Sequence, residues 1–208
     1  MTVRPDPQVA RARYEHVCAE LVGRRISQVT YWHLHGFGNG PPEWDFGDWH
    51  HAEVEVELLT DAGPYTVTWT PTFDDYGIEI LREPAFSASQ LSTEQPPEFT
   101  RAEGHPRWLQ LLSSPVREAA IYWETVTRYP TVSFRDGVPV VENREDVRSV
   151  PFAQRLDFDD GPVWMLAAIP PTTSDDQPFM GADEVLVVFT AERMLRFGFP
   201  DGAFVRSR

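Results

Sequence analysis

Leu58-Leu-Thr-Asp-Ala-Gly-Pro64 and Leu156-Asp-Phe-Asp-Asp-Gly-Pro162 are the two stretches that decide the fold, because each reads as the turn of a β-hairpin. An alternating pattern of apolar and polar residues runs into each Gly-Pro and resumes beyond it, over Tyr65–Trp69 and Val163–Ala167. A Gly-Pro pair between two alternating runs is a turn signal. We therefore expect one hairpin in each half of the chain.

The similarity between the halves extends upstream of the hairpins. Residues 21–32 resemble residues 111–123, with one residue inserted, and a helix candidate precedes each of them. These candidates are residues 8–22, whose apolar side chains form one stripe at helical spacing, and residues 105–112. The sequence therefore reads as one helix–strand–loop–hairpin unit that occurs twice.

Residues 115–126 carry two conflicting signals. Ser114 followed by Pro115 is typical of the start of a helix. The similarity to the extended segment 26–32 favours a strand instead, and tertiary context commonly overrides local propensity. We predict a strand.

The expected fold class is α+β, with two diverged helix–strand–loop–hairpin repeats that form mainly antiparallel sheet. Residues 1–83 form the first half, residues 84–104 a linker and residues 105–208 the second half, together in one compact domain. The near-continuous apolar run at 184–189 predicts a central strand. We expect the two halves to share one sheet or to pack sheet on sheet.

The composition excludes several classes of function. The 208 residues carry 32 acids and 18 bases, all of them arginine, for a net charge of −14. Without lysine there is no P-loop or Schiff-base chemistry. The acidic balance argues against nucleic acid and against an anionic membrane surface as partners. Cys18 is the single cysteine, and no apolar run is long enough to span a membrane, so a cytoplasmic location is the expectation.

The negative charge is concentrated in one region. Ten acids and no bases lie between Arg25 and Arg82. Within this region, strict alternation predicts that Glu53, Glu55 and Glu57 share one face of a strand. The alternatives are a solvated face that keeps the protein soluble and a docking surface for a basic partner.

The segment 31–51 holds four of the six histidines: His33, His35, His50 and His51. If the strands that flank it pair with each other, these imidazoles converge with Asp45 or Asp48. Such a set suits zinc or another divalent metal. The alternative is an ordered loop whose histidines lie at the surface, where acidic neighbours would raise their pKa values.

Two tryptophans in this segment are candidates for an interface. Acids flank both Trp44 and Trp49, and exposed tryptophan is frequent at interfaces. Together with Trp32, Trp69 and Tyr76 they also suggest a groove for a sugar or a peptide.

The favoured functional hypothesis is a non-enzymatic cytoplasmic protein-binding module that presents an acidic, tryptophan-bearing face to a basic partner protein. An immunity protein or an accessory subunit has this profile. This hypothesis has no catalytic residues and no cofactor, and its partner-binding residues are Trp44, Asp45, Asp48, Trp49, Glu53, Glu55 and Glu57. The alternative is an enzyme that depends on zinc or another divalent metal, in particular a hydrolase, and uses the four histidines.

Overall fold

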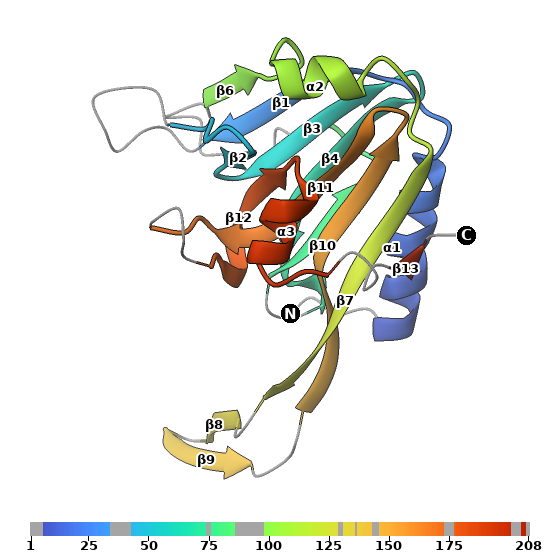
Figure 1. Ribbon diagram of the computed structural model, residues 1–208. Helices are drawn as coiled ribbons and strands as arrows, with labels where there is room; N and C mark the ends of the chain where they lie inside the picture. Colours follow the sequence, from blue (N-terminus) through green and yellow to red (C-terminus); the bar gives the residue numbers. More distant parts are fainter. Residues whose placement is uncertain are drawn as a thin grey trace.

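The computed structural model shows an α+β protein in which two antiparallel sheets pack face to face (Figure 1). The described residues are 6–33, 43–73, 76–85, 98–128, 131–135, 137–142, 146–172, 177–200 and 205–206. Of the two arrangements expected from the sequence, sheet on sheet is the one observed.

Sheet A has five strands in the order β5-β4-β3-β1-β6. Their bounds are β1 (Ile26–His33), β3 (Glu55–Thr60), β4 (Gly63–Thr70), β5 (Gly77–Leu81) and β6 (Glu98–Arg101), and the short 3₁₀ helix η1 (Pro71–Phe73) follows β4. Because β6 pairs with β1, the end of the segment expected to be a linker is a strand of this sheet. Residues 86–97 of that segment lie outside the described residues.

Sheet B has six strands in the order β13-β7-β10-β11-β12-β2. Their bounds are β2 (Trp49–Ala52), β7 (Glu118–Arg128), β10 (Asp146–Phe158), β11 (Gly161–Ile169), β12 (Phe179–Val188) and β13 (Val205–Arg206). Strands β7 and β10 run on beyond the body of the protein as a long arm, and the hairpin of β8 (Thr131–Arg135) and β9 (Val138–Glu142) lies at its end (Figure 1). As the apolar run predicted, β12 is an interior strand of the sheet.

Both predicted hairpins are present and are built alike. In β3–β4 the pair Thr60↔Gly63 closes the turn, and in β10–β11 the pair Phe158↔Gly161 does so. Gly63 has φ +108° and Gly161 has φ +130°, a backbone region that L side chains rarely adopt. A Cβ at either position would meet nothing within 4 Å, so the turn conformation, and not lack of space, requires glycine.

The prediction of a strand at 115–126 is confirmed, since β7 begins at Glu118. It pairs with β10 from Glu118↔Asp157 to Asp146↔Arg128. The long ladder of backbone hydrogen bonds outweighs the helical preference of Glu118-Ala-Ala120, which is worth only a few tenths of a kcal/mol per residue.

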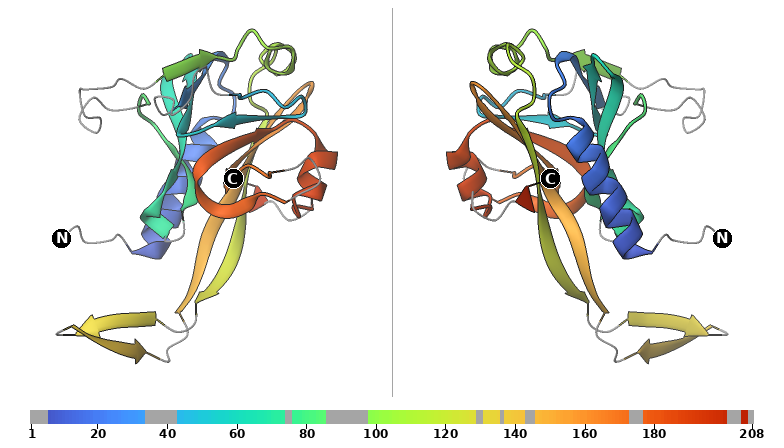
Figure 2. Two further views of the ribbon diagram at one scale, coloured as in Figure 1. Left: turned by 90° about the vertical axis from the view of Figure 1, so that its left-hand side faces the viewer. Right: turned by 90° about the vertical axis from the view of Figure 1, so that its right-hand side faces the viewer.

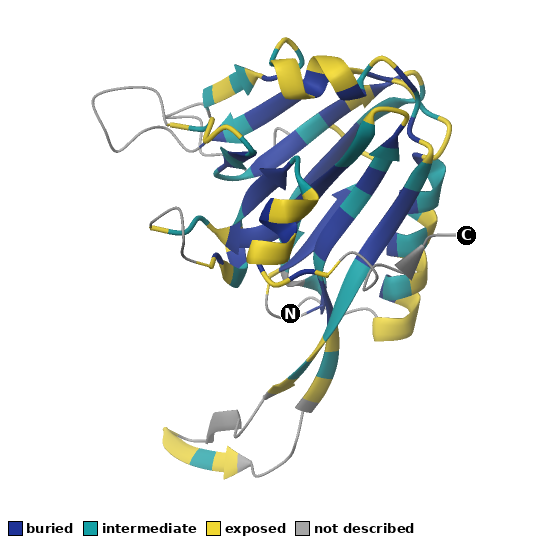
Figure 3. Ribbon diagram, viewed as in Figure 1, coloured by how far each residue is buried: buried dark blue, intermediate teal, exposed yellow. Residues whose placement is uncertain are grey.

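The two predicted helices are also confirmed, as α1 (Pro7–Glu20) and α2 (Pro106–Leu111). Helix α1 starts where the Asp6 side chain accepts the N–H of Gln8. Its buried Tyr14 and Cys18 face the core, and α1 lies beside the sheets next to β5 and β7 (Figure 2). Helix α3 (Ala191–Arg196) covers the outer face of sheet B, where a second apolar cluster forms (Figure 3).

The sheets share an order of connected strands. Sheet A contains β1-β3-β4-β5 and sheet B contains β7-β10-β11-β12, and in each the central pair is the hairpin. An internal duplication would give this order, but the duplication itself stays a prediction. No helix in the described ranges has both the length and the apolar character that a membrane crossing needs.

Strand β2 connects the two sheets. Its four residues pair with β12 in sheet B, and β3 begins in sheet A three residues after β2 ends. As in any strand, neighbouring side chains of β2 point to opposite faces of the sheet, here sheet B. His50 points to the side of the core between the sheets, whereas Trp49 joins the cluster beneath α3.

Candidate metal centre

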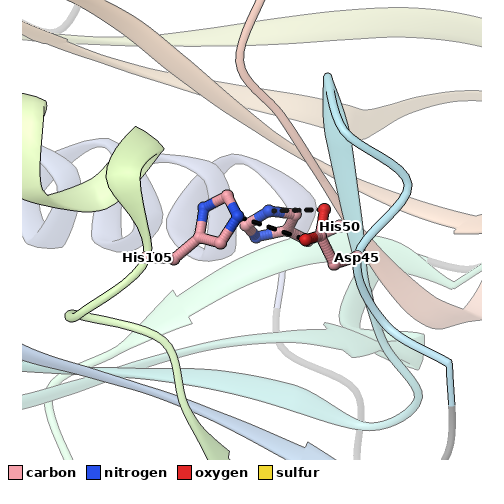
Figure 4. Close-up of side chains that lie close together, drawn as sticks. All are labelled: Asp45, His50 and His105. Carbon is pink, nitrogen blue, oxygen red and sulfur yellow. Dashed lines mark hydrogen bonds and ion pairs between the residues drawn. The ribbon is translucent and has the colours of Figure 1, made fainter.

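Asp45, His50 and His105 lie together at one end of the two sheets (Figure 4). They come from three separate segments: the loop before β2, β2 itself, and the residue before α2. His50 Nε2 is 3.6 Å from Asp45 Oδ1, and His105 Nε2 is 3.2 Å from Asp45 Oδ2. All three ligand atoms lie within 4.8 Å of one another.

His50 is the buried member of this group, with 0% of its side chain exposed. Its Nδ1 is 2.8 Å from the hydroxyl of Tyr31, which also accepts a hydrogen bond of 2.6 Å from Trp108 Nε1. Its Nε2 is buried and makes no hydrogen bond with the described residues. Burial, followed by the charges of His105 and Arg107, lowers the pKa of His50 to about 3 against the opposing effect of Asp45. His50 is therefore neutral near pH 7, the form that binds metal.

His105 caps helix α2. Its Nδ1 accepts the N–H of Arg107 at 3.3 Å, while its Nε2 faces Asp45. The imidazole rings of His105 and His50 are nearly perpendicular, at 84°, with their centroids 4.4 Å apart. The beginning of α2 thus fixes His105 against β2.

Asp45 closes the group from the loop side. It forms an isolated β-bridge with His50, and its Oδ1 accepts the N–H of Gly47 at 2.9 Å. This hydrogen bond, together with the two histidines, lowers the pKa of Asp45. The carboxylate is ionised at neutral pH, and because 41% of its side chain is exposed, the group is open to solvent on this side.

Aromatic rings enclose the histidines. The ring centroid of Trp44 is 4.9 Å from that of His50 and 5.7 Å from that of His105. Phe189 packs edge-on against His50 at 4.6 Å. These rings hold the imidazoles in place and keep water from the buried side.

The distances within the group are compatible with a metal ion, and His105 Nε2 and Asp45 Oδ2 are also within hydrogen-bond distance of each other at 3.2 Å. Two ligand atoms about 2.1 Å from a tetrahedral Zn²⁺ are about 3.4 Å apart. His50 Nε2 lies 3.6 Å from Asp45 Oδ1, and His105 Nε2 lies 3.2 Å from Asp45 Oδ2, so each histidine is close to this spacing from one carboxylate oxygen. A distance of 3.6 Å is too long for a hydrogen bond. Two imidazoles and one carboxylate suit Zn²⁺ or Fe²⁺.

Metal binding through both Nε2 atoms requires a proton on each Nδ1. The hydroxyl of Tyr31 can form a hydrogen bond with Nδ1 of His50 whether or not this nitrogen carries a proton, because a hydroxyl both donates and accepts hydrogen bonds. At His105 the protonated Nδ1 gives up the bond from the N–H of Arg107, at a cost of about 1 kcal/mol for a lost cap. This cost is small beside the roughly 10 kcal/mol or more that a bound zinc ion contributes in small zinc domains.

Of the three predicted histidines that lie within the described residues, His50 is the one that belongs to this group. His51 faces away from His50, and its Nε2 lies 2.8 Å from Glu184 Oε2. His33 is buried on β1, and burial and the nearby His51 lower the pKa of His33 to about 4. His35 lies outside the described residues.

The residues predicted to bind a partner are not all on the surface. Trp49 is 6% exposed and Glu55 8% exposed, so both are buried. Asp48 pairs with Arg193 at 2.9 Å. Trp44 packs against the histidines, Glu57 accepts the N–H of Ala85 at 2.9 Å, and Glu53 is half-buried. Of these residues Asp45 is the exposed one, and it belongs to the candidate metal centre.

Sequence reasoning missed His105, Tyr31, Trp108 and Phe189 as parts of the site. The predicted start of a helix at 105 was the one available signal for His105. A histidine directly before a proline and a helical pattern occupies a cap position, but nothing local places it beside Asp45, 60 residues away.

Comparisons with known proteins do not identify a relative: no family model, curated protein or solved structure matches the chain. The arguments for function therefore rest on the geometry of the site.

Proposed function

We propose that the protein binds a divalent metal ion through Asp45, His50 and His105 and uses it in a hydrolytic reaction. The observation that carries the proposal is the fully buried Nε2 of His50, which makes no hydrogen bond among the described residues and faces the carboxylate of Asp45. Leaving a buried polar atom unpaired costs about 1–3 kcal/mol, and a metal ion would remove this cost.

The open side of the centre supports a catalytic role over a purely structural one. Structural zinc sites use four protein ligands, whereas catalytic sites use three and leave a position for water or substrate. Here three ligands are available, and Asp45 keeps the group accessible to solvent. A bound divalent metal supplies a water molecule whose pKa is lowered towards 7. Tyr31 would orient His50 through its Nδ1, the role that partners of metal-binding histidines commonly have.

Calorimetric titration of metal-free protein with Zn²⁺ and Fe²⁺ tests the metal site. We expect one equivalent to bind to the native protein and at least tenfold weaker binding to His105→Asn, because one of three ligands is lost. His16→Asn is the matched control, since His16 lies on the exposed surface of α1. Equal affinities of the native protein and His105→Asn, or no binding at all, would overturn the metal site.

A hydrolysis assay tests the reaction. The metal-loaded protein is expected to release p-nitrophenol from p-nitrophenyl phosphate or p-nitrophenyl acetate, and His105→Asn to lose this activity. Stoichiometric metal without turnover of either ester would argue for a metal-binding protein that is not a hydrolase of this kind.

Docking of a basic partner protein remains the second candidate function. The observation that favours it is Phe46, which lies in the acidic loop before β2 and is 39% exposed. Its ring stacks on that of Trp49, the first residue of β2. Aromatic side chains, phenylalanine included, are enriched in protein–protein interfaces. If the proposal is right, capture of the partner weakens with increasing salt and with Phe46→Ser, and capture that is insensitive to both would contradict it.

A further inference from the structure

A small pocket lies next to the candidate metal centre. It has a volume of about 180 Å³ and lies between α2 and the turn that joins β10 to β11. Leu111, Pro162 and Phe189 form its apolar walls, and Arg107, Gln110 and Asp160 contribute polar groups. Its size suits one small chemical group and not a folded partner.

Two residues connect the pocket with the metal centre. Phe189 lines the pocket, and its ring centroid is 4.6 Å from that of His50. Arg107 follows His105 by two residues, and its backbone N–H donates to His105 Nδ1 at 3.3 Å. A molecule seated in the pocket would therefore lie beside the position of the metal ion.

Arg107 is held in place yet keeps part of its binding capacity. Its Nε donates to the backbone oxygen of Gly47 at 3.3 Å, which ties it to the loop that carries Asp45. Among the described residues, this is the hydrogen bond that the Arg107 side chain makes, and it leaves the two terminal nitrogens available. The neighbouring Asp160 uses its Oδ2 to accept a hydrogen bond from Ser113. Arg11, Arg117 and Arg196 by contrast are each paired with a carboxylate.

We propose that this pocket binds the oxyanion group of the substrate, a carboxylate or a phosphate, with Arg107 as its partner. The planar guanidinium offers paired N–H donors that match either group. Phe189 packs against the apolar part of the same molecule, and the bond to be cleaved lies towards Asp45. The assignment of this molecule as a substrate rests on the proposed hydrolytic function, whereas binding of the oxyanion does not require the metal.

The test is a titration with inorganic phosphate and, separately, with acetate, followed by NMR at the Arg107 Nε–H and the Phe189 N–H. Metal-free protein is used first, so that direct coordination of the anion to the metal makes no contribution, and Zn²⁺-loaded protein second. We expect Arg107→Gln to weaken binding about tenfold or more, and Arg107→Lys to weaken it less. Arg196→Gln, at an exposed arginine of α3, is the matched control. The ratio of the two affinities distinguishes phosphate from carboxylate.

Metal content is measured on every sample, so that the two proposals fail separately. Equal anion affinities of native protein and Arg107→Gln, or no binding of either anion, overturn the oxyanion pocket whatever the metal content. Absence of bound metal overturns the metal centre, while an Arg107-dependent titration in the same sample still supports the pocket. A melting curve for each variant establishes that it is folded.

Discussion

The hydroxyl of Tyr31 is the most informative single group to remove, because two buried partners depend on it. It accepts the N–H of Trp108 and is bonded to Nδ1 of His50, at 2.6 and 2.8 Å. In Tyr31→Phe both partners lose this bond inside the core. At about 1–3 kcal/mol for each unpaired group, the variant loses about 2–6 kcal/mol of unfolding free energy. For a domain of this size, that lowers Tm by roughly 5–20 °C.

Tyr65→Phe is the matched control for this prediction. Tyr65 is also fully buried, but its hydroxyl has no hydrogen-bond partner among the described residues, so its removal costs little. Thermal unfolding followed by circular dichroism measures both variants under identical conditions. Zinc titration of Tyr31→Phe is expected to show an affinity about 10–100-fold lower, because His50 is no longer oriented. Equal Tm values for the two variants would refute this reasoning about the Tyr31 network.

Three further predictions concern the fold. Gly77→Ala places a Cβ 2.8 Å from Pro151 Cδ and should lower the free energy of unfolding, measured by chemical denaturation, by about 1–3 kcal/mol. Gly104→Ala is the control, because its Cβ meets nothing within 4 Å. Equal stabilities of the two variants would contradict the clash. The pKa of His33 is about 4 in the folded protein and about 6.5 when unfolded, so the unfolded state takes up the proton first. The contribution of His33 to the free energy of unfolding is therefore complete above pH 6.5, and about 3 kcal/mol of it is lost as the pH falls towards 4. In His33→Gln the free energy of unfolding should fall less steeply over this pH range. An unchanged slope would exclude His33 as its source. Asp6→Ala removes the cap of α1 and should lower stability by about 1 kcal/mol in the same assay, with no change as the contrary result.

Much of the fold could be predicted from local sequence signals. The turns before Gly63 and Gly161 set two hairpins, because the residues on either side alternate and the turns need a positive φ. The stripe through Tyr14 and Cys18 predicted α1 for the same kind of reason. Strand β2 was harder to place, because it pairs with β12, more than a hundred residues later, and leaves sheet A for sheet B.

The candidate site was only partly predictable. His50 and Asp45 stood out because histidines and acids are concentrated in residues 31–51. We expected His50 and His51 to bind the same metal ion. Neighbouring residues on a strand point to opposite faces of the sheet, so the two side chains do not meet. His105 was out of reach, because its distance from Asp45 is set by how α2 packs, not by any local pattern.

The acidic face illustrates the same limit. Alternation predicted a row of exposed carboxylates at Glu53, Glu55 and Glu57. Glu55 is instead 8% exposed, and Glu57 accepts the backbone N–H of Ala85. Charge counted along a sequence does not reveal which carboxylates other segments cover.

The position of a bound metal ion tests the central claim most directly. Crystals of zinc-loaded protein, measured at the zinc absorption edge, give an anomalous difference map in which the zinc ion is by far the strongest scatterer. We predict one strong peak about 2.0–2.2 Å from His50 Nε2, His105 Nε2 and a carboxylate oxygen of Asp45. A map without a peak among these three side chains, or with its peak at His51 and Glu184 instead, would contradict the account.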